Sequence, residues 1–100
     1  MIVGIPKEIK QDEYRIALPP DKVHLLRENG HHVLVESGAG LGAGIVDSVY
    51  EQAGATLVRG PAQIFMEAEM IMKVKEPQPQ EVSMLHKGQI LFTYLHLAAE

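Results

Sequence analysis

Three residues of the sequence, Arg15, Lys75 and His96, have side chains suited to acid–base chemistry on a small anion. An arginine presents a planar fork of N–H donors that can hold a carboxylate through two hydrogen bonds. A lysine offers a compact positive charge that can polarise a carbonyl oxygen or hold a second carboxylate oxygen. A histidine titrates near neutral pH and can exchange a proton with a hydroxyl, an amine or water. The set suits a 2-oxo acid or an α-amino acid that has a proton to move.

Each of these residues also has an ordinary structural interpretation. An arginine in a polar loop is usually a solvated surface charge. Lys75 is followed by Glu76, which is consistent with a surface ion pair of little energetic value. His96 lies between Leu95 and Leu97, which is typical of a histidine with a structural hydrogen bond. The residue types alone leave both interpretations open, and the functional one requires the three side chains to converge in space.

The elements that would position these side chains are short apolar runs that alternate with amphipathic stretches. The apolar runs predict buried strands at Ile2–Ile5, 33–35, Thr56–Val58, 70–74 and 90–94. The stretches between them predict helices at 21–29, 47–53, 61–68 and 79–86. Residues 7–13 are polar and predict a loop, and residues 15–18 predict a short extended piece that two prolines stop.

This alternation predicts an α/β fold, flavodoxin-like or Rossmann-like, with a parallel sheet and helices on both of its faces. In such sheets, ligands gather outside the carboxyl ends of the strands. Arg15 follows the first predicted strand, Lys75 comes directly after the fourth, and His96 lies just past the fifth. The sequence therefore predicts a substrate site at this edge of the sheet.

The composition argues against several classes of function. The formal net charge is −4 and the basic residues are scattered, which argues against a nucleic-acid-binding protein. There is no cysteine, which excludes a disulfide framework and cysteine-based metal or redox chemistry. No run approaches the ~20 apolar residues of a membrane span, and the N-terminal apolar run is too short for a signal peptide. We therefore expect a cytoplasmic protein without membrane insertion.

Two other motifs were candidates for ligand binding. The segment 38–44 has glycine at every second position, but this spacing is not G-x-G-x-x-G and no acidic residue follows in the required place. We interpret it as a turn that lets backbone segments pack closely. His31 and His32 would point to opposite faces of a strand, so they form a poor metal pair, and we expect no metal site.

Four ordered motifs resemble those of the alanine dehydrogenase family. The opening segments Gly-Ile-Pro-Lys-Glu at 4–8 and Glu-Tyr-Arg-Ile-Ala at 13–17 are similar to the beginning of that family. Gly-Ala-Gly at 38–40 follows its middle pattern. Val-Lys-Glu-Pro at 74–77 and Leu-Phe-Thr-Tyr-Leu-His-Leu-Ala at 91–98 match its two most telling motifs. The resemblance extends over the whole chain.

The resemblance implies an enzyme for the reversible oxidative deamination of L-alanine to pyruvate and ammonium, with NAD as the hydride acceptor. By the same resemblance, Arg15 and Lys75 would bind the substrate through its carboxylate and carbonyl oxygens. His96 would be the catalytic general acid and base. Members of this family have two domains and are homo-oligomers, often hexamers. They bind NAD in a Rossmann domain that is inserted after the first part of the substrate domain.

The sequence carries no Rossmann fingerprint. We therefore interpret residues 1–100 as the N-terminal part of an incomplete substrate-binding domain, with no cofactor-binding residues and with NAD bound by a domain absent from this chain. We expect this part to be inactive alone, where it could also form a dimer. Two alternatives stay open. One is the related NAD-binding subunit of nicotinamide nucleotide transhydrogenase, which is not expected to keep both Lys75 and His96. The other is a stand-alone module that binds small carboxylates or serves as a non-catalytic scaffold.

Overall fold

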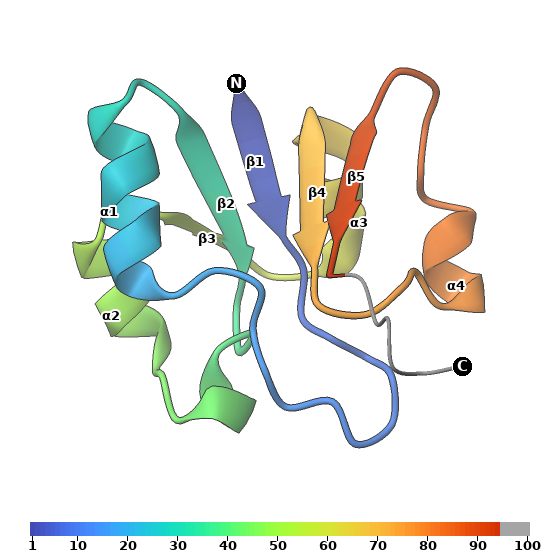
Figure 1. Cartoon of the computed structure of the whole chain (residues 1–100), viewed down its shortest axis with the longest axis horizontal. Coiled ribbons are helices and arrows are strands. Elements are labelled where there is room, and N and C mark those ends of the chain that lie inside the picture. Colours follow the sequence, from blue (N-terminus) through green and yellow to red (C-terminus); the bar gives the residue numbers. More distant parts are fainter. Residues whose placement is uncertain (95–100) are drawn as a thin grey trace.

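The chain folds around a five-stranded sheet whose strands all run parallel (Figure 1). The computed structural model describes residues 1–94. The strands are β1 (Ile2–Ile5), β2 (His32–Glu36), β3 (Thr56–Val58), β4 (Met70–Lys73) and β5 (Ile90–Thr93). The helices are α1 (Pro20–Glu28), α2 (Asp47–Gln52), α3 (Pro61–Glu67) and α4 (Pro79–Val82), with a 3-10 turn η1 (Leu41–Ala43). These bounds match the predicted ones to within one residue, except that α4 is shorter than predicted.

The strand order β3-β2-β1-β4-β5 puts the first strand in the middle of the sheet. The chain adds β2 and β3 on one side of β1 and then returns to add β4 and β5 on the other side. Where the order of an open parallel sheet reverses, a crevice forms outside the carboxyl ends of the two strands, which are here β1 and β4. The predicted α/β fold is confirmed, and its topology puts this crevice between the loop after β1 and the segment after β4.

Helices pack against both faces of the sheet, as predicted. On the face covered by α1 and α2, Val33 and Val35 of β2 belong to one buried apolar cluster. On the opposite face, α3 lies behind β4 and β5 in Figure 1, and its fully buried Ile64 and Phe65 form a second cluster with Leu34. Successive side chains of a strand point to opposite faces, which explains why neighbouring β2 residues enter different clusters.

Gly4 allows α3 to approach the central strand closely. A Cβ at this position would lie 2.8 Å from Ala68 Cβ and 2.8 Å from Ile64 Cγ2, so no larger residue fits without a shift. The neighbouring Val3 and Ile5 are buried on the other face of the sheet. Because β1 is packed from both faces, its carboxyl end is a rigid starting point for the loop that follows.

Residues 15–18 belong to no strand, and the chain bends at Ala17 and Leu18, so the predicted extended piece does not continue to Leu18. Ala17 and Leu18 are buried, which explains the apolar character that suggested a strand. Their carbonyl oxygens are satisfied by side chains: Tyr50 Oη donates to Leu18 O at 2.8 Å, and Tyr94 Oη donates to Ala17 O at 2.8 Å. Burial raises the pKa of Tyr50 to about 12, so its hydroxyl stays protonated as this bond requires.

In the part of the chain that the structure describes, an apolar surface beside α1 is exposed. Phe92 pairs in register with Met72, and both line an apolar pocket of about 480 Å³ together with Met70. Ile90 and Phe92 are 47% and 45% exposed. None of the helices in residues 1–94 combines the length and apolar character that crossing a membrane would need.

Candidate active site

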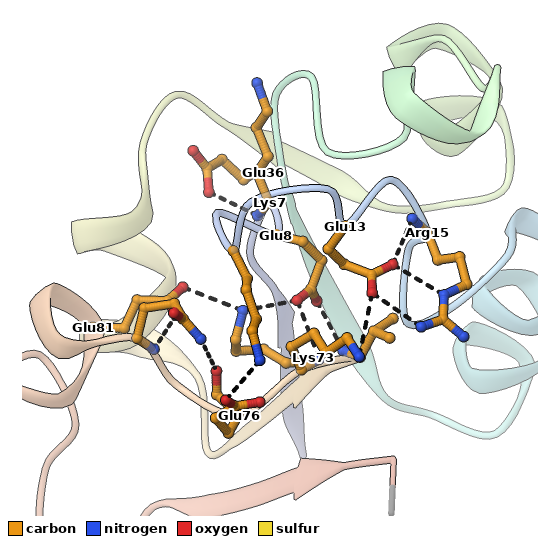
Figure 2. A network of polar contacts seen from close by, with 12 residues as sticks. Lys7, Glu8, Glu13, Arg15, Glu36, Lys73, Glu76 and Glu81 are labelled. Carbon is orange, nitrogen blue, oxygen red and sulfur yellow. Dashed lines mark hydrogen bonds and ion pairs between the residues drawn. The ribbon is translucent and has the colours of Figure 1, made fainter. Parts of the chain in front are cut away.

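The loop after β1 and the segment after β4 meet at the carboxyl edge of the sheet, where they form a network of charged side chains (Figure 2). The loop, residues 6–15, contributes Glu8, Glu13 and Arg15. A pocket of about 310 Å³ lies between this loop and the glycine-containing segment 38–42 that follows β2. The predicted edge of the sheet thus carries both a hollow and a concentration of charge.

Glu8 connects the two segments. Its Oε2 atom accepts a hydrogen bond from the backbone N–H of Val74 at 2.8 Å, and its Oε1 atom accepts one from the N–H of Lys75 at 3.3 Å. The Glu8 side chain is only 3% exposed. A carboxylate in the first loop therefore fixes the backbone from which Lys75 projects.

Lys73, the last residue of β4, is a buried cation between two buried carboxylates. Its Nζ atom lies 3.0 Å from Glu8 Oε1 and 3.3 Å from Glu81 Oε2, and its side chain is 1% exposed. Glu81 also accepts a hydrogen bond from the N–H of Gln78 at 2.9 Å, which connects α4 to the same network. Buried charges persist only when paired and hydrogen-bonded, and this group meets both conditions.

Glu13 holds Arg15 in one orientation. Its carboxylate accepts hydrogen bonds from Arg15 Nε at 3.0 Å, from Nη2 at 2.9 Å and from the backbone N–H at 2.9 Å. The side-chain hydrogen bonds from Arg15 are the main reason that the pKa of Glu13 is lowered to about 2. Hydrogen bonding to Glu13 also raises the pKa of Arg15. At neutral pH both groups are therefore charged.

Lys75 approaches the same carboxylate from the segment after β4. Its Nζ atom lies 4.0 Å from Glu13 Oε1, the oxygen that also accepts from Arg15 Nη2. The structure thus brings two of the three predicted site residues together, although Lys75 does not line the 310 Å³ pocket that Arg15 borders. His96, the third, lies outside the described residues.

The rim of the site is held by further polar contacts. Lys10 Nζ lies 3.0 Å from Glu76 Oε2, which again joins the loop after β1 to the segment after β4. Hydrogen bonding from Lys10 lowers the pKa of Glu76. Glu36, at the end of β2, accepts a hydrogen bond from the N–H of Lys7 at 2.8 Å, and burial raises the pKa of its carboxyl group.

The glycine-containing segment is a close-packed turn, as predicted. A Cβ at Gly42 would lie 2.9 Å from the carbonyl oxygen of Tyr14, and one at Gly40 would lie 2.7 Å from that of Ile45. The segment therefore forms a wall of the pocket by backbone contact with the loop after β1. Among the described residues, no three His, Asp or Glu side chains gather closely enough to hold a metal ion.

Sequence reasoning missed the carboxylates of the site and the buried lysine. Lys73 left a signal, because its alternation with Ile71 placed it on the buried face of a strand, where a lysine needs a partner. Glu8 and Glu13 lie in the polar loop after a buried strand, at the edge where ligands were expected. Nothing in the sequence indicated that these two would be less exposed than the arginine beside them.

Chemically, the arrangement places two cations, Arg15 and Lys75, beside the Glu13 carboxylate, which is ionised at neutral pH. Arg15 is 63% exposed and Lys75 is 23% exposed, so both cations are accessible to a small molecule, whereas Glu13 behind them is 4% exposed. Guanidinium and ammonium groups on neighbouring loops can hold a carboxylate and polarise an adjacent carbonyl.

The family described as alanine dehydrogenase/PNT, N-terminal domain, matches residues 4–100. The chain belongs to this family. It is 58% identical over 100 residues to an alanine dehydrogenase of Bacillus subtilis, covering 100% of this chain and 26% of that protein. An alanine dehydrogenase of Methanococcus maripaludis is 50% identical over 100 residues, with 27% of that protein covered. The chain thus spans about a quarter of the length of these curated relatives.

Solved structures of this alanine dehydrogenase/PNT family have the same fold. An L-alanine dehydrogenase matches 99% of this chain and 27% of its own chain, with a TM-score of 0.92 and 50% identity. A transhydrogenase from Sinorhizobium meliloti matches 95% of this chain and 27% of its own, with a TM-score of 0.88 and 38% identity. Both solved structures share the fold of this chain, and the L-alanine dehydrogenase is the more similar of the two in sequence.

Proposed function

We propose that this chain is the N-terminal part of the substrate-binding domain of an NAD-dependent L-alanine dehydrogenase. The whole enzyme would convert L-alanine reversibly to pyruvate and ammonium. The observation that carries the proposal is the meeting of Arg15 and Lys75 over one carboxylate, at the crevice where the strand order reverses. Identities of 50–58% to alanine dehydrogenases, against 38% to a transhydrogenase, support the dehydrogenase over the alternative.

Arg15 would bind the substrate carboxylate. Glu13 takes the Nε–Nη2 edge of the guanidinium, which leaves the Nη1–Nη2 edge as the one that a second carboxylate would meet. Because Glu13 fixes the plane of the guanidinium before substrate arrives, little side-chain entropy is lost when the substrate binds. A fixed carboxylate in turn holds the substrate α-carbon in one position, which is what a hydride transfer requires.

Lys75 would hold the carbonyl oxygen of pyruvate, or the corresponding position of the intermediates, and stabilise negative charge there. Glu8 fixes the backbone at this residue, which limits how far the ammonium group can move. His96 would exchange the proton as water adds to the imine and ammonia leaves. The role of His96 follows from the motif at 91–98 and its place just beyond β5.

The described residues around the crevice do not fit NAD. The turn after β1 begins with Pro6 instead of a glycine fingerprint, and the crevice is occupied by charged side chains suited to a small anion. We therefore assign NAD to another domain of the whole protein and derive no step through it from these residues. A cytoplasmic homo-oligomer, by analogy a hexamer, is part of the same proposal.

An enzyme chimera tests the proposal. Residues 1–100 replace the matching segment of the Bacillus subtilis alanine dehydrogenase, and NAD reduction is measured with L-alanine. We expect activity within about tenfold of the parent enzyme. His96→Ala should lower kcat by about 10²–10⁴-fold, the usual contribution of a general acid or base. Arg15→Ala should mainly raise KM for pyruvate.

The outcomes separate the alternatives. A folded chimera that reduces no NAD with L-alanine rejects the proposal, and normal turnover in the His96 variant rejects the acid–base role. The chain alone offers an independent measurement through a pyruvate titration followed by NMR. Shifts centred on Arg15 and Lys75 would indicate a preformed half-site, whereas shifts nowhere in the chain would favour a non-catalytic scaffold.

A further inference from the structure

We infer that Glu13 determines the charge selectivity of the site, so that it favours substrates with one carboxylate over substrates with two. This inference rests on the proposed function and deepens it, because it names the class of 2-oxo acid that the site accepts. Glu13 acts here as a positioning and specificity-determining residue, through its contacts with the two cations.

The geometry places Glu13 beside both cations, and Glu13 and Arg15 both line the 310 Å³ pocket. Its Oε1 atom is shared, at 2.9 Å from Arg15 Nη2 and 4.0 Å from Lys75 Nζ. Its Oε2 atom accepts from Arg15 Nε at 3.0 Å. Only 4% of the Glu13 side chain is exposed, against 63% for Arg15. Glu13 is therefore a fixed carboxylate of the site, held by three hydrogen bonds from Arg15, and we expect a substrate not to displace it.

The consequence is a matter of charge. Arg15 and Lys75 bring two positive charges and Glu13 brings one negative charge, so the three groups carry a net charge of +1. The nearby Lys73 adds no further cation to this sum, because it lies between two buried carboxylates, Glu8 at 3.0 Å and Glu81 at 3.3 Å. A net charge of +1 is balanced by a single substrate carboxylate.

In a substrate with two carboxylates, the first would already balance the positive charge of Arg15, Lys75 and Glu13, so the second would find no unbalanced positive charge on these three groups. The Nε–Nη2 edge of Arg15, which could have held it, is occupied by Glu13. Its charge would also face the carboxylate of Glu13 at short range, where like charges repel appreciably. Replacing Glu13 by glutamine removes the charge with little change in shape. It also removes the negative charge that neutralises Arg15 and that would face the second carboxylate.

The experiment uses the active chimera described above, with Glu13→Gln, Glu13→Asp and the control Glu28→Gln. Glu28 lies on the exposed part of α1 and pairs only loosely with His24 at 3.3 Å, so its replacement changes net charge equally without touching the site. Reductive amination is measured with oxaloacetate, which has two carboxylates, and with 2-oxobutyrate, which has similar length but an uncharged end.

For Glu13→Gln, we expect the ratio of kcat/KM for oxaloacetate to that for 2-oxobutyrate to rise about tenfold, which corresponds to 1.4 kcal/mol. Glu13→Asp keeps the charge and should leave the ratio within twofold, as should Glu28→Gln. An unchanged ratio in Glu13→Gln overturns the inference while the proposed function stands. Equal losses of kcat for both substrates in the Gln and Asp variants, with no change of ratio, would also overturn it.

A second measurement needs no variant, so it tests the inference even if the Glu13→Gln protein does not fold. Propionate and malonate are compared as competitive inhibitors of the unaltered chimera against pyruvate. They are similar in size but carry one and two carboxylates. We expect malonate to bind no more tightly than propionate. Malonate binding tenfold more tightly would show a site with uncompensated positive charge and would reject the role of Glu13.

Discussion

The buried cation Lys73 gives the sharpest test of how the site is held together. The perturbation is Lys73→Met, which keeps an unbranched side chain of similar length and removes the charge. Lys73 is 1% exposed, and its partners Glu8 and Glu81 are 3% and 2% exposed. Breaking a buried ion pair by removing one partner leaves an uncompensated charge and costs about 3–5 kcal/mol. The variant leaves two such carboxylates, so we expect a loss of at least about 3 kcal/mol.

The chain contains a matched control for this variant. Lys10 and Glu76 are also 3.0 Å apart, but their side chains are 41% and 62% exposed. Exposed ion pairs contribute only about 0–1 kcal/mol. Lys10→Met should therefore cost less than about 1 kcal/mol, although the nitrogen–oxygen distance is the same as between Lys73 and Glu8. The difference between the two variants therefore measures the effect of burial on the free energy of unfolding at equal ion-pair distance.

The assay is urea unfolding of the 100-residue chain, followed by circular dichroism at neutral pH, with the free energy of unfolding taken from the linear extrapolation. Adding Glu8→Gln and Glu81→Gln to Lys73→Met should recover part of the loss, because neutral amides leave no buried charge. Equal losses in Lys73→Met and Lys10→Met, within about 0.5 kcal/mol, would refute the reasoning. The reasoning would also be refuted if Glu8→Gln and Glu81→Gln lowered the stability of the Lys73→Met variant further.

Three further predictions concern stability. The pKa of Glu13 is lowered from 4.5 to about 2 in the folded chain. Its contribution to the free energy of unfolding is therefore fully present above pH 4.5 and is lost as the pH falls toward 2. Glu13→Gln should reduce the pH dependence of the free energy of unfolding in this range. Tyr50→Phe removes the buried hydrogen bond to Leu18 O and should cost about 1–2 kcal/mol in urea unfolding. Gly4→Ala places a Cβ 2.8 Å from Ala68 Cβ and should cost about 1–3 kcal/mol, measured in the same way. A free energy of unfolding for Gly4→Ala equal to that of the unaltered chain would contradict the close packing of α3.

Most of the fold could be predicted because its elements are short and regular, and because prolines and glycines separate them. Apolar runs such as Ile2–Ile5 and Thr56–Val58 have the composition of buried parallel strands, and prolines and glycines mark the helix ends. The exception at 15–18 has a physical reason. Buried apolar residues there obtain their hydrogen bonds from tyrosine side chains instead of a neighbouring strand, and sequence periodicity cannot distinguish these cases.

The candidate site could be predicted only in part. Arg15 and Lys75 were identified because their chemistry and their positions after strands are visible in the sequence. The roles of Glu8 and Glu13 depend on which loops meet, and that depends on the strand order, which a single sequence does not specify. A carboxylate in a polar loop looks the same whether it is 3% or 60% exposed, although its energetic role differs between those cases.

The hydrogen bonds of Glu8 also bear on the order in which the protein folds. Its partners Lys73, Val74 and Lys75 are 65, 66 and 67 residues away along the chain. Contacts between such distant residues close a large loop and form slowly compared with local ones. Arg15 and Lys75 can therefore come together only after β4 has docked beside β1. Amide exchange at Val74 would report this step directly, since its N–H is bonded to Glu8 only once the loop after β1 and the segment after β4 have met.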